Sequence, residues 1–246
     1  MFPLSDENPH FLRPYTTYAL IALNLIAWFF VQGMGTEPDL AVSVCTLGLI
    51  PGELLQTLAP GTRFQAGPTA FCVLSDTPNW LTMLSHMFLH GGWLHIIGNM
   101  WFLWIFGNNV EDSMGHLRFL IFYLLCGFGA AGVQILADPD AGIPMVGASG
   151  AIGGVMGAYV LLYPRVRVKM LVFLGFFVTT FRVPAMWMLG YWFVAQVVGG
   201  IGSIGAQGGV AFWAHVGGFV VGAALIFLFK VPELVDRHPN RGWQSG

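Results

Sequence analysis

Hydrophobic residues run through this chain in long, nearly unbroken stretches that are separated by short polar segments. Six of these stretches approach the ~20 helical residues that are needed to cross roughly 30 Å of hydrocarbon. The fold class predicted from this pattern is all-α, a polytopic membrane protein built as a bundle of six transmembrane helices. The predicted spans are residues 15–31, 84–106, 117–136, 146–163, 184–200 and 210–229.

The segments between the spans predict the domain organisation. Residues 1–14 form an N-terminal tail, residues 15–230 a membrane domain, and residues 231–246 a C-terminal tail. A long outer loop covers about residues 34–80 and contains Cys45 and Cys72, whose spacing leaves open whether they pair. Residues 170–180 are apolar but too short to span, so we expect an interfacial connection there. We expect no cleaved signal peptide, because no small-residue cleavage site ends the first apolar run.

The positions of the Lys and Arg residues predict how the spans are oriented in the membrane. Cationic loops favour the cytoplasmic side of a membrane. Nine of the ten Lys and Arg residues fall on the side of the two termini, and only Arg63 lies in the outer loop. We therefore expect both termini in the cytoplasm.

The composition indicates no nucleic-acid partner. The chain has 56% hydrophobic and 9% charged residues, a net charge of −2 and no long basic run, so it lacks the basic surface that binds nucleic acid.

Few polar residues remain inside the predicted spans. Because polar groups are costly in a bilayer, those that occur there mark function by default. Ser149 and His215 each lie five or six residues inside the outer end of a span, roughly 8 to 9 Å deep at ~1.5 Å per residue, so they can meet. The polar residues of the spans are His86, His90, His95, Asn99, Ser149 and His215, with Asn24, Gln134 and Gln196 elsewhere.

Small residues surround this serine and histidine. GxxxG spacing lets membrane helices approach closely. It occurs in the serine helix and the histidine helix, at Gly150–Gly154, Gly153–Gly157 and Gly218–Gly222. These glycines are equally compatible with packing alone, and a lone serine in such a helix is usually a packing residue.

The combination favours a Ser-His dyad. A serine hydroxyl needs a base within hydrogen-bond reach, and His215 provides one for Ser149. The spans contain no acid that would complete a triad. The Asn99 amide, a His95 N–H and the Ser149 backbone N–H would stabilise an oxyanion.

A metal centre is the alternative use of the histidines. His86 and His90 have i, i+4 spacing, but the zinc-protease signature H-E-x-x-H is absent and no carboxylate lies nearby. We therefore expect no metal and no cofactor.

Three motifs stand out at these positions: the stretch from His90 through His95 to Asn99, Gly147-Ala148-Ser149-Gly150, and Ala214-His215 followed by Gly217, Gly218 and Gly222. In this order they resemble the motifs of a known family, the rhomboid intramembrane serine proteases, and the resemblance extends over nearly the whole six-helix chain.

The resemblance implies a bacterial inner-membrane protease. Ser149 would be the nucleophile and His215 the base, with His95, Asn99 and the Ser149 amide as the oxyanion hole. The substrates would be single-span membrane proteins cut near the outer face, usually after a small residue. Positions that match structural ones in the family are His90, Glu111, Gly115, Gly147, Gly150, Gly218 and Gly222.

Two departures from the family pattern stand out. Trp80 is followed by Leu81 rather than Arg. Gly153 occupies a position where some members place an aromatic residue beneath the histidine, so the sequence does not say what orients His215. Trp192 and Phe193 in the fifth predicted span are a possible gate for substrates, or they simply pack or anchor at the interface.

Three other functions are compatible with such a chain. A rhomboid-like protein without activity would bind client transmembrane helices and usually lacks the serine or the histidine, whereas both are present here. A transporter would show an internal repeat or charged residues at mid-bilayer. An acyltransferase could use Ser149 but would not call for an outward-facing cleft. Substrate identity and oligomeric state are not readable from the sequence.

Overall fold

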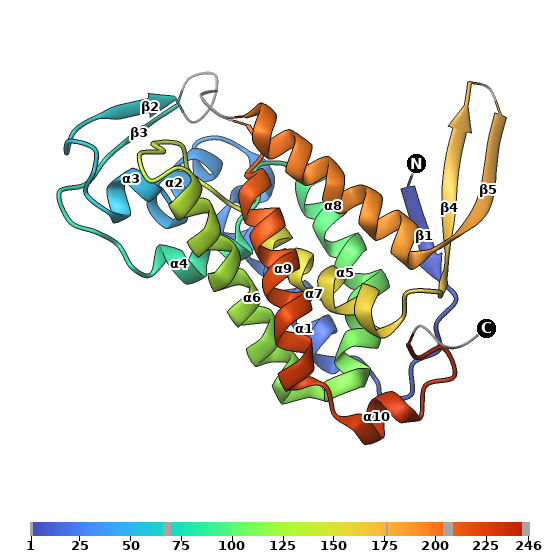
Figure 1. The fold of residues 1–246 in the computed structure, drawn as a ribbon. Helices are drawn as coiled ribbons and strands as arrows, with labels where there is room; N and C mark the ends of the chain where they lie inside the picture. Colours follow the sequence, from blue (N-terminus) through green and yellow to red (C-terminus); the bar gives the residue numbers. More distant parts are fainter. Residues whose placement is uncertain (1, 66–69, 176, 204–208, 243–246) are drawn as a thin grey trace.

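The structure is a bundle of long helices with a small sheet at one end and a loop-rich cap at the other (Figure 1). This computed structural model describes residues 2–65, 70–175, 177–203 and 209–242. The described part is mostly helical, which confirms the predicted all-α membrane class. Three helices are long and apolar enough to span by length and composition: α6 (His116–Ala137), α8 (Ala185–Gly202) and α9 (Phe212–Phe229). The count of six spans stays a prediction.

The first and fourth predicted spans are shorter apolar helices. The first comprises α1 (Tyr15–Ile26) and a π-helical turn, η1 (Ala27–Val31). The fourth, α7 (Ser149–Leu162), begins three residues later than the sequence predicted, because residues 146–148 approach the site as extended and looped chain. Eleven of the fourteen residues of α7 are buried, so this helix forms the centre of the bundle.

The second predicted span was wrong at both ends. The chain over 84–106 is broken, and the long helix α5 (Trp93–Met114) begins nine residues late and continues eight residues further. Gly91 and Gly92 cause the break, because consecutive glycines disfavour helix. Two short turns precede it, α4 (Thr82–Ser85) and the 3₁₀ turn η3 (His86–Phe88). The helix ends at Gly115, whose φ of +81° favours glycine.

Glycine brings α7 and α9 into backbone contact. A Cβ placed on Gly218 would lie 1.9 Å from the Gly150 carbonyl oxygen, and one on Gly222 would lie 2.0 Å from the Gly154 carbonyl oxygen. Nothing larger than hydrogen fits at either position. The predicted GxxxG packing is therefore present in this seam, and it places the start of α7 beside the start of α9.

Residues 170–180 form part of a β-hairpin, whereas the sequence predicted only an interfacial connection there. β4 (Arg167–Leu174) pairs antiparallel with β5 (Phe177–Pro184), and β1 (Phe2–Asp6) pairs with the other edge of β4. The hairpin projects from the helical body (Figure 1). Valine, phenylalanine and threonine dominate it, and such residues favour strands. An extended pair also satisfies its own backbone, which an isolated interfacial segment would not.

The outer loop is folded and cross-linked. A disulfide joins Cys45 in helix α2 (Asp39–Leu47) to Cys72 in strand β3 (Phe71–Val73), which answers the question that the sequence left open. The remaining elements of the loop are the 3₁₀ turn η2 (Gly33–Gly35), the short helix α3 (Pro51–Leu54) and strand β2 (Arg63–Gln65), which pairs with β3.

The opposite end of the bundle buries two acids that fasten the N-terminal tail. Glu111 accepts hydrogen bonds from the backbone N–H groups of Thr16 and Thr17, at 2.8 Å each, where α1 begins. Asp112 accepts from the N–H groups of Phe11 and Leu12. A buried charge is tolerated when it is paired in this way. The chain after α9 turns back across this end through α10 (Pro232–Asp236).

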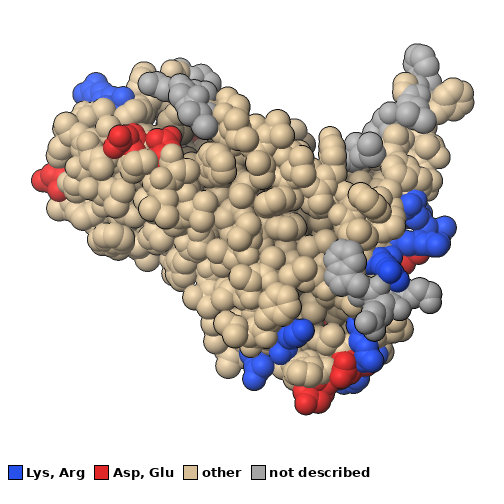
Figure 2. All heavy atoms as spheres, in the orientation of Figure 1, with Lys and Arg blue, Asp and Glu red and all other residues tan. Residues whose placement is uncertain are grey.

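Charged residues gather at two ends of the molecule. On the face drawn in Figure 2 a broad uncharged band separates the two charged ends. A bilayer-embedded helical bundle requires such a band, since charged side chains are costly in hydrocarbon. The surface thus agrees with the membrane character of the helices.

Candidate active site

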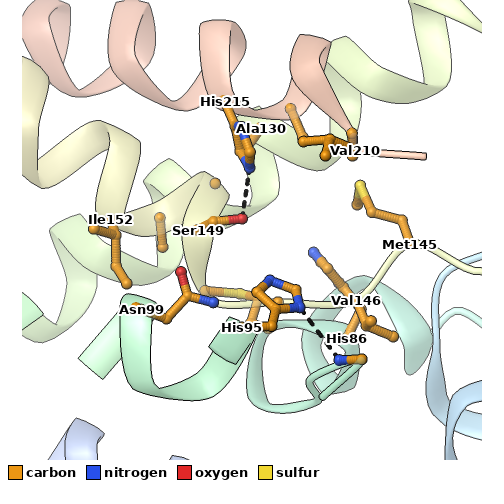
Figure 3. Close-up of a pocket in the computed structure, with 18 of the residues that line it drawn as sticks. His86, His95, Asn99, Ala130, Met145, Val146, Ser149, Ile152, Val210 and His215 are labelled. Atoms are coloured by element: carbon orange, nitrogen blue, oxygen red, sulfur yellow. Dashed lines mark hydrogen bonds between the residues drawn. The ribbon is translucent and has the colours of Figure 1, made fainter. Parts of the chain in front are cut away.

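Ser149 and His215 are brought together by the seam between α7 and α9. Ser149 is the first residue of α7, and His215 lies in the first turn of α9. The Ser149 Oγ lies 2.7 Å from the His215 Nε2 (Figure 3). Gly153 and Gly218 keep side chains out of the interface below, so the two backbones approach closely enough for this hydrogen bond.

A glutamine on α8 completes the surroundings of the histidine. The His215 Nδ1 lies 2.7 Å from the Gln196 Oε1. The Gln196 Nε2 donates to the Trp192 carbonyl oxygen at 3.3 Å, which leaves the acceptor oxygen facing the imidazole. The Trp192 ring lies 5.8 Å from the imidazole centroid at an interplanar angle of 36°.

From the sequence alone, Gln196 is recognisable only as a polar residue in a predicted span. Its spacing of four residues from Trp192 was the signal that could have linked them, because i and i+4 share a helix face.

His95 and Asn99 face Ser149 from α5, on the side away from His215 (Figure 3). The Gly91 N–H donates to the His95 Nδ1 at 3.2 Å, so in the neutral ring the proton is on Nε2. The Asn99 Nδ2 is buried and has no hydrogen-bond partner among the described residues. An unpaired buried donor is rare in proteins, and this one lies beside Ser149. Two N–H donors are therefore available to a negatively charged oxygen.

The Ser149 backbone N–H is a third donor. It belongs to the first turn of α7, where backbone N–H groups have no partner within the helix and the helix dipole is positive. Gly147 makes room for these donors. Its φ is +130°, and a Cβ there would lie 2.7 Å from the His95 Nε2. Any other residue at this position would be strained and would crowd the donor.

These groups line a cleft of about 470 Å³. Its walls come from η3, α5, α6, α7, α8 and α9, together with the segments that precede α7 and α9. The polar groups are confined to the neighbourhood of Ser149, and the remaining lining is largely apolar, as is usual for ligand sites. A few of the apolar lining residues are Leu94, Phe102, Met145, Val146, Ile152 and Val210.

The other predicted site residues lie in different parts of the structure, outside the pair formed by Ser149 and His215. His86 lines the cleft, and its Nδ1 lies 2.8 Å from the Thr82 carbonyl oxygen. The His90 ring is fully buried against the His95 ring, and its backbone N–H donates to Gln32. Glu111 lies at the far end of α5, where it caps α1. In the part of the chain that the structure describes, no three His, Cys, Asp or Glu side chains cluster to hold a metal.

The two proposed gate residues, Trp192 and Phe193, differ in what they contact. Trp192 lies against His215, whereas Phe193 packs on Phe219 of α9 at 4.7 Å between ring centroids. Tyr191 and Trp187 are 76% and 66% exposed and face the surroundings of the protein. Only three of the eighteen residues of α8 are buried: Ala185, Leu189 and Gly200.

The family model described as the rhomboid domain matches residues 77–231, more than half of the chain. The chain belongs to the rhomboid family. The match contains all of the residues that line the cleft.

Individual relatives agree with this assignment. RHOMBOID-like protein 5 of Arabidopsis thaliana is 29% identical over 171 residues, which are 63% of this chain and 55% of the relative. Rhomboid-like protein 11, chloroplastic, of the same plant is 38% identical over 85 residues, 35% of this chain and 30% of the relative. Rhomboid protein 1, mitochondrial, of Saccharomyces cerevisiae is 24% identical over 172 residues, 67% of this chain and 46% of the relative. This rhomboid thus spans about half or less of the length of the curated relatives it matches.

Proposed function

We propose that this rhomboid is an intramembrane serine endopeptidase that cuts single-span membrane proteins in or near their transmembrane segments. The observation that carries the proposal is the 2.7 Å hydrogen bond between the Ser149 Oγ and the His215 Nε2 on the wall of an apolar cleft. A nucleophile that contacts its base, with N–H donors on the opposite side, is the arrangement that amide hydrolysis requires.

The reaction would run in two halves. His215 Nε2 takes the hydroxyl proton as Ser149 Oγ attacks the substrate carbonyl, and the resulting oxyanion lies among the donors of His95, Asn99 and the Ser149 amide. The proton then passes from His215 to the leaving amine, and the C–N bond breaks. A water molecule next attacks the acyl ester with His215 again as base, which releases the acid and restores Ser149.

The location of the enzyme is part of the proposal. We place it in a bacterial inner membrane with both termini in the cytoplasm, residues 15–230 as the membrane domain, and residues 1–14 and 231–246 as tails. The Cys45–Cys72 disulfide supports an outward-facing loop, because disulfides persist in oxidising compartments. Residues 243–246 of the C-terminal tail lie outside the described residues.

The test is cleavage of a single-span reporter in liposomes by purified protein. Wild type should cut near the outer end of the reporter helix, and Ser149→Ala and His215→Ala should each lower the rate by roughly 10⁴-fold or more. Ser203→Ala is the matched control, since that hydroxyl donates to the Gly200 carbonyl oxygen at the end of α8. It should cut like wild type.

Equal cleavage by all four proteins would indicate a contaminating protease. If none of them cuts, a fluorophosphonate probe separates a poor reporter from an inactive protein. Labelling that depends on Ser149 and His215 supports the protease. The absence of labelling favours the second possibility, a rhomboid-like protein that binds client helices without cleaving them.

A further inference from the structure

The His215 imidazole is held from a helix that carries neither the nucleophile nor the base. Gln196 lies on α8, in the middle of the helix, and its side-chain oxygen is the hydrogen-bond partner of the His215 Nδ1. Gly153 presents no side chain to the ring from α7, and the place of its missing Cβ is 3.0 Å from the His215 carbonyl oxygen. Among the described residues, the hydrogen-bond partner of Nδ1 and the aromatic contact of the ring both come from α8, whereas the partner of Nε2 is Ser149 on α7.

The hydrogen bonds of Gln196 determine which nitrogen of His215 carries the proton. An amide has one acceptor oxygen and one donor nitrogen. Because the donor is occupied by the Trp192 carbonyl oxygen, the atom that faces His215 Nδ1 is the acceptor. Nδ1 must therefore carry the hydrogen. In a neutral ring this leaves a lone pair on Nε2, 2.7 Å from the Ser149 hydroxyl.

We propose that Gln196 is the positioning residue of the dyad: it fixes the His215 tautomer that can accept the Ser149 proton, and it does so from α8. This inference rests on the proposed function, because the tautomer matters for catalysis only if His215 is the base. A neutral amide suits the location, since a charged orienting group would be costly within the bilayer. An amide performs the same task in proteases that combine cysteine, histidine and asparagine.

A positioning role differs from a packing role in its consequences. Loss of the acceptor leaves the ring in place but removes the preference for one tautomer, so substrate binding should not change while turnover falls. Gln196→Leu has nearly the same volume and is apolar, so it suits a membrane helix. We expect it to lower kcat about tenfold with an unchanged KM, which corresponds to about 1.4 kcal/mol of transition-state stabilisation.

The chain offers a matched control. Gln134 on α6 is also a half-buried span glutamine next to the base, and its Oε1 accepts a hydrogen bond from the Ala214 N–H at 3.1 Å. Gln134→Leu therefore removes an equivalent amide that touches the backbone of α9 rather than the imidazole. It should leave the tautomer unchanged. Gln196→Glu, in the neutral protonated form that the bilayer favours, keeps a carbonyl acceptor for Nδ1 and an O–H donor for the Trp192 carbonyl oxygen, and should retain kcat within about threefold of wild type.

The decisive measurement does not depend on cleavage. In protein labelled with ¹⁵N-histidine, the ring nitrogens of His215, assigned through the signals lost in His215→Ala, report the tautomer directly. Wild type and Gln134→Leu should show the proton on Nδ1, and Gln196→Leu should show a mixture. A Gln196→Leu spectrum identical to wild type, or an unchanged kcat, would overturn the positioning role.

The failure of the protease proposal would look different. In that case wild type neither cuts the reporter nor reacts with the fluorophosphonate, whatever the tautomer. A tautomer shift in Gln196→Leu would then report a structural hydrogen bond only, and the positioning role would be overturned together with the dyad.

Discussion

The α7–α9 seam and helix α8 differ in how tightly they are packed, although both contact His215. The seam is close-packed, and at Gly218 and Gly222 even a methyl group would overlap a backbone oxygen of α7. In contrast, α8 has three buried residues out of eighteen. Its side chains Trp187, Tyr191, Val194 and Val198 are 58% to 76% exposed. One side of the site is therefore rigid, and the other is held by few contacts.

This difference separates two requirements of hydrolysis in a membrane. The distance between nucleophile and base must be constant, which close packing provides. A substrate helix must also reach the cleft, which requires a boundary that can open, and regions with few buried contacts open most readily. The seam serves the first requirement, and α8 is suited to the second.

The largest expected effect follows from disturbing the seam. Gly218→Ala forces a methyl group against the Gly150 carbonyl oxygen, so the helices must separate and the contact between Ser149 and His215 is lost. We expect activity to fall to background and the free energy of unfolding to drop by about 1–3 kcal/mol. Thermal unfolding in detergent measures the second effect. Gly190→Ala on α8 is the control, since nothing beyond the adjacent backbone of its own helix lies within 4 Å of the added Cβ; equal effects of the two substitutions would contradict the comparison.

A smaller effect is expected from the fixed oxyanion side of the site. Asn99→Ala removes a buried donor that has no other partner in the described structure, so folding should be little affected. We expect kcat to fall by about 10²- to 10³-fold, as for other oxyanion-hole donors. Steady-state kinetics in liposomes tests this. Unchanged kcat with a raised KM would mean that Asn99 binds substrate instead.

Weakening the packing of α8 should raise the rate of cleavage rather than lower it. Phe193→Ala removes the closer of the two ring contacts that α8 makes with Phe219, so α8 should open more often and reporter cleavage should rise severalfold. The rate of labelling by the small fluorophosphonate probe should stay constant, because that probe needs no opening wide enough for a helix. Tyr191→Ala, which alters an exposed ring on the same helix, is the control. Equal cleavage by wild type and Phe193→Ala would remove Phe193 as a gate.

The smallest effect concerns the N-terminal tail, which contacts the end of α7 remote from Ser149. Burial raises the pKa of the Asp6 carboxyl from 3.8 to about 6, although the Tyr159 hydroxyl donates to it at 2.6 Å. Between these pKa values the folded tail binds more protons than the unfolded one, so its docking is strongest below about pH 4 and weakens as pH rises through 6. The change should be on the order of 1 kcal/mol, because this half-buried site is screened by water.

Hydrogen exchange of the β1 amides between pH 4 and pH 7, corrected for intrinsic rates, measures this docking. Asp6→Asn should abolish the pH dependence. A pH dependence that persists in Asp6→Asn would assign it to another group.

Several features of this molecule could be predicted from the sequence because they follow from local patterns. Apolar run length identified the helical membrane class, and matched depth with GxxxG spacing predicted that Ser149 and His215 can meet. The start of α5 was wrong because apolar content hid the break at Gly91 and Gly92.

What could not be predicted depends on contacts between distant segments. The hairpin of β4 and β5 is stabilised partly by β1, about 165 residues earlier in the chain, so its local sequence was ambiguous. Likewise, the contact of Gln196 with His215 depends on how α8 is oriented relative to α9. Helical periodicity puts Gln196 on the same helix face as Trp192, but it does not say which face of α8 meets His215.

Helix α8 is held at its N-terminal end, where it joins the hairpin, so a small rotation about that end moves the rest of the helix. Strand β5 runs straight into α8 at Pro184, and the helix is pinned where it starts by the Ala185 and Met186 N–H groups, which donate to the Val166 and Pro164 carbonyl oxygens. Gln196 lies eleven residues from this pivot, roughly 16 Å along the axis at ~1.5 Å per residue. A swing of about 10° displaces its amide by roughly 3 Å, more than a hydrogen bond tolerates. We therefore expect that an outward swing of α8, if it admits a substrate helix, would break the hydrogen bond between Gln196 and His215, and that its return would restore it.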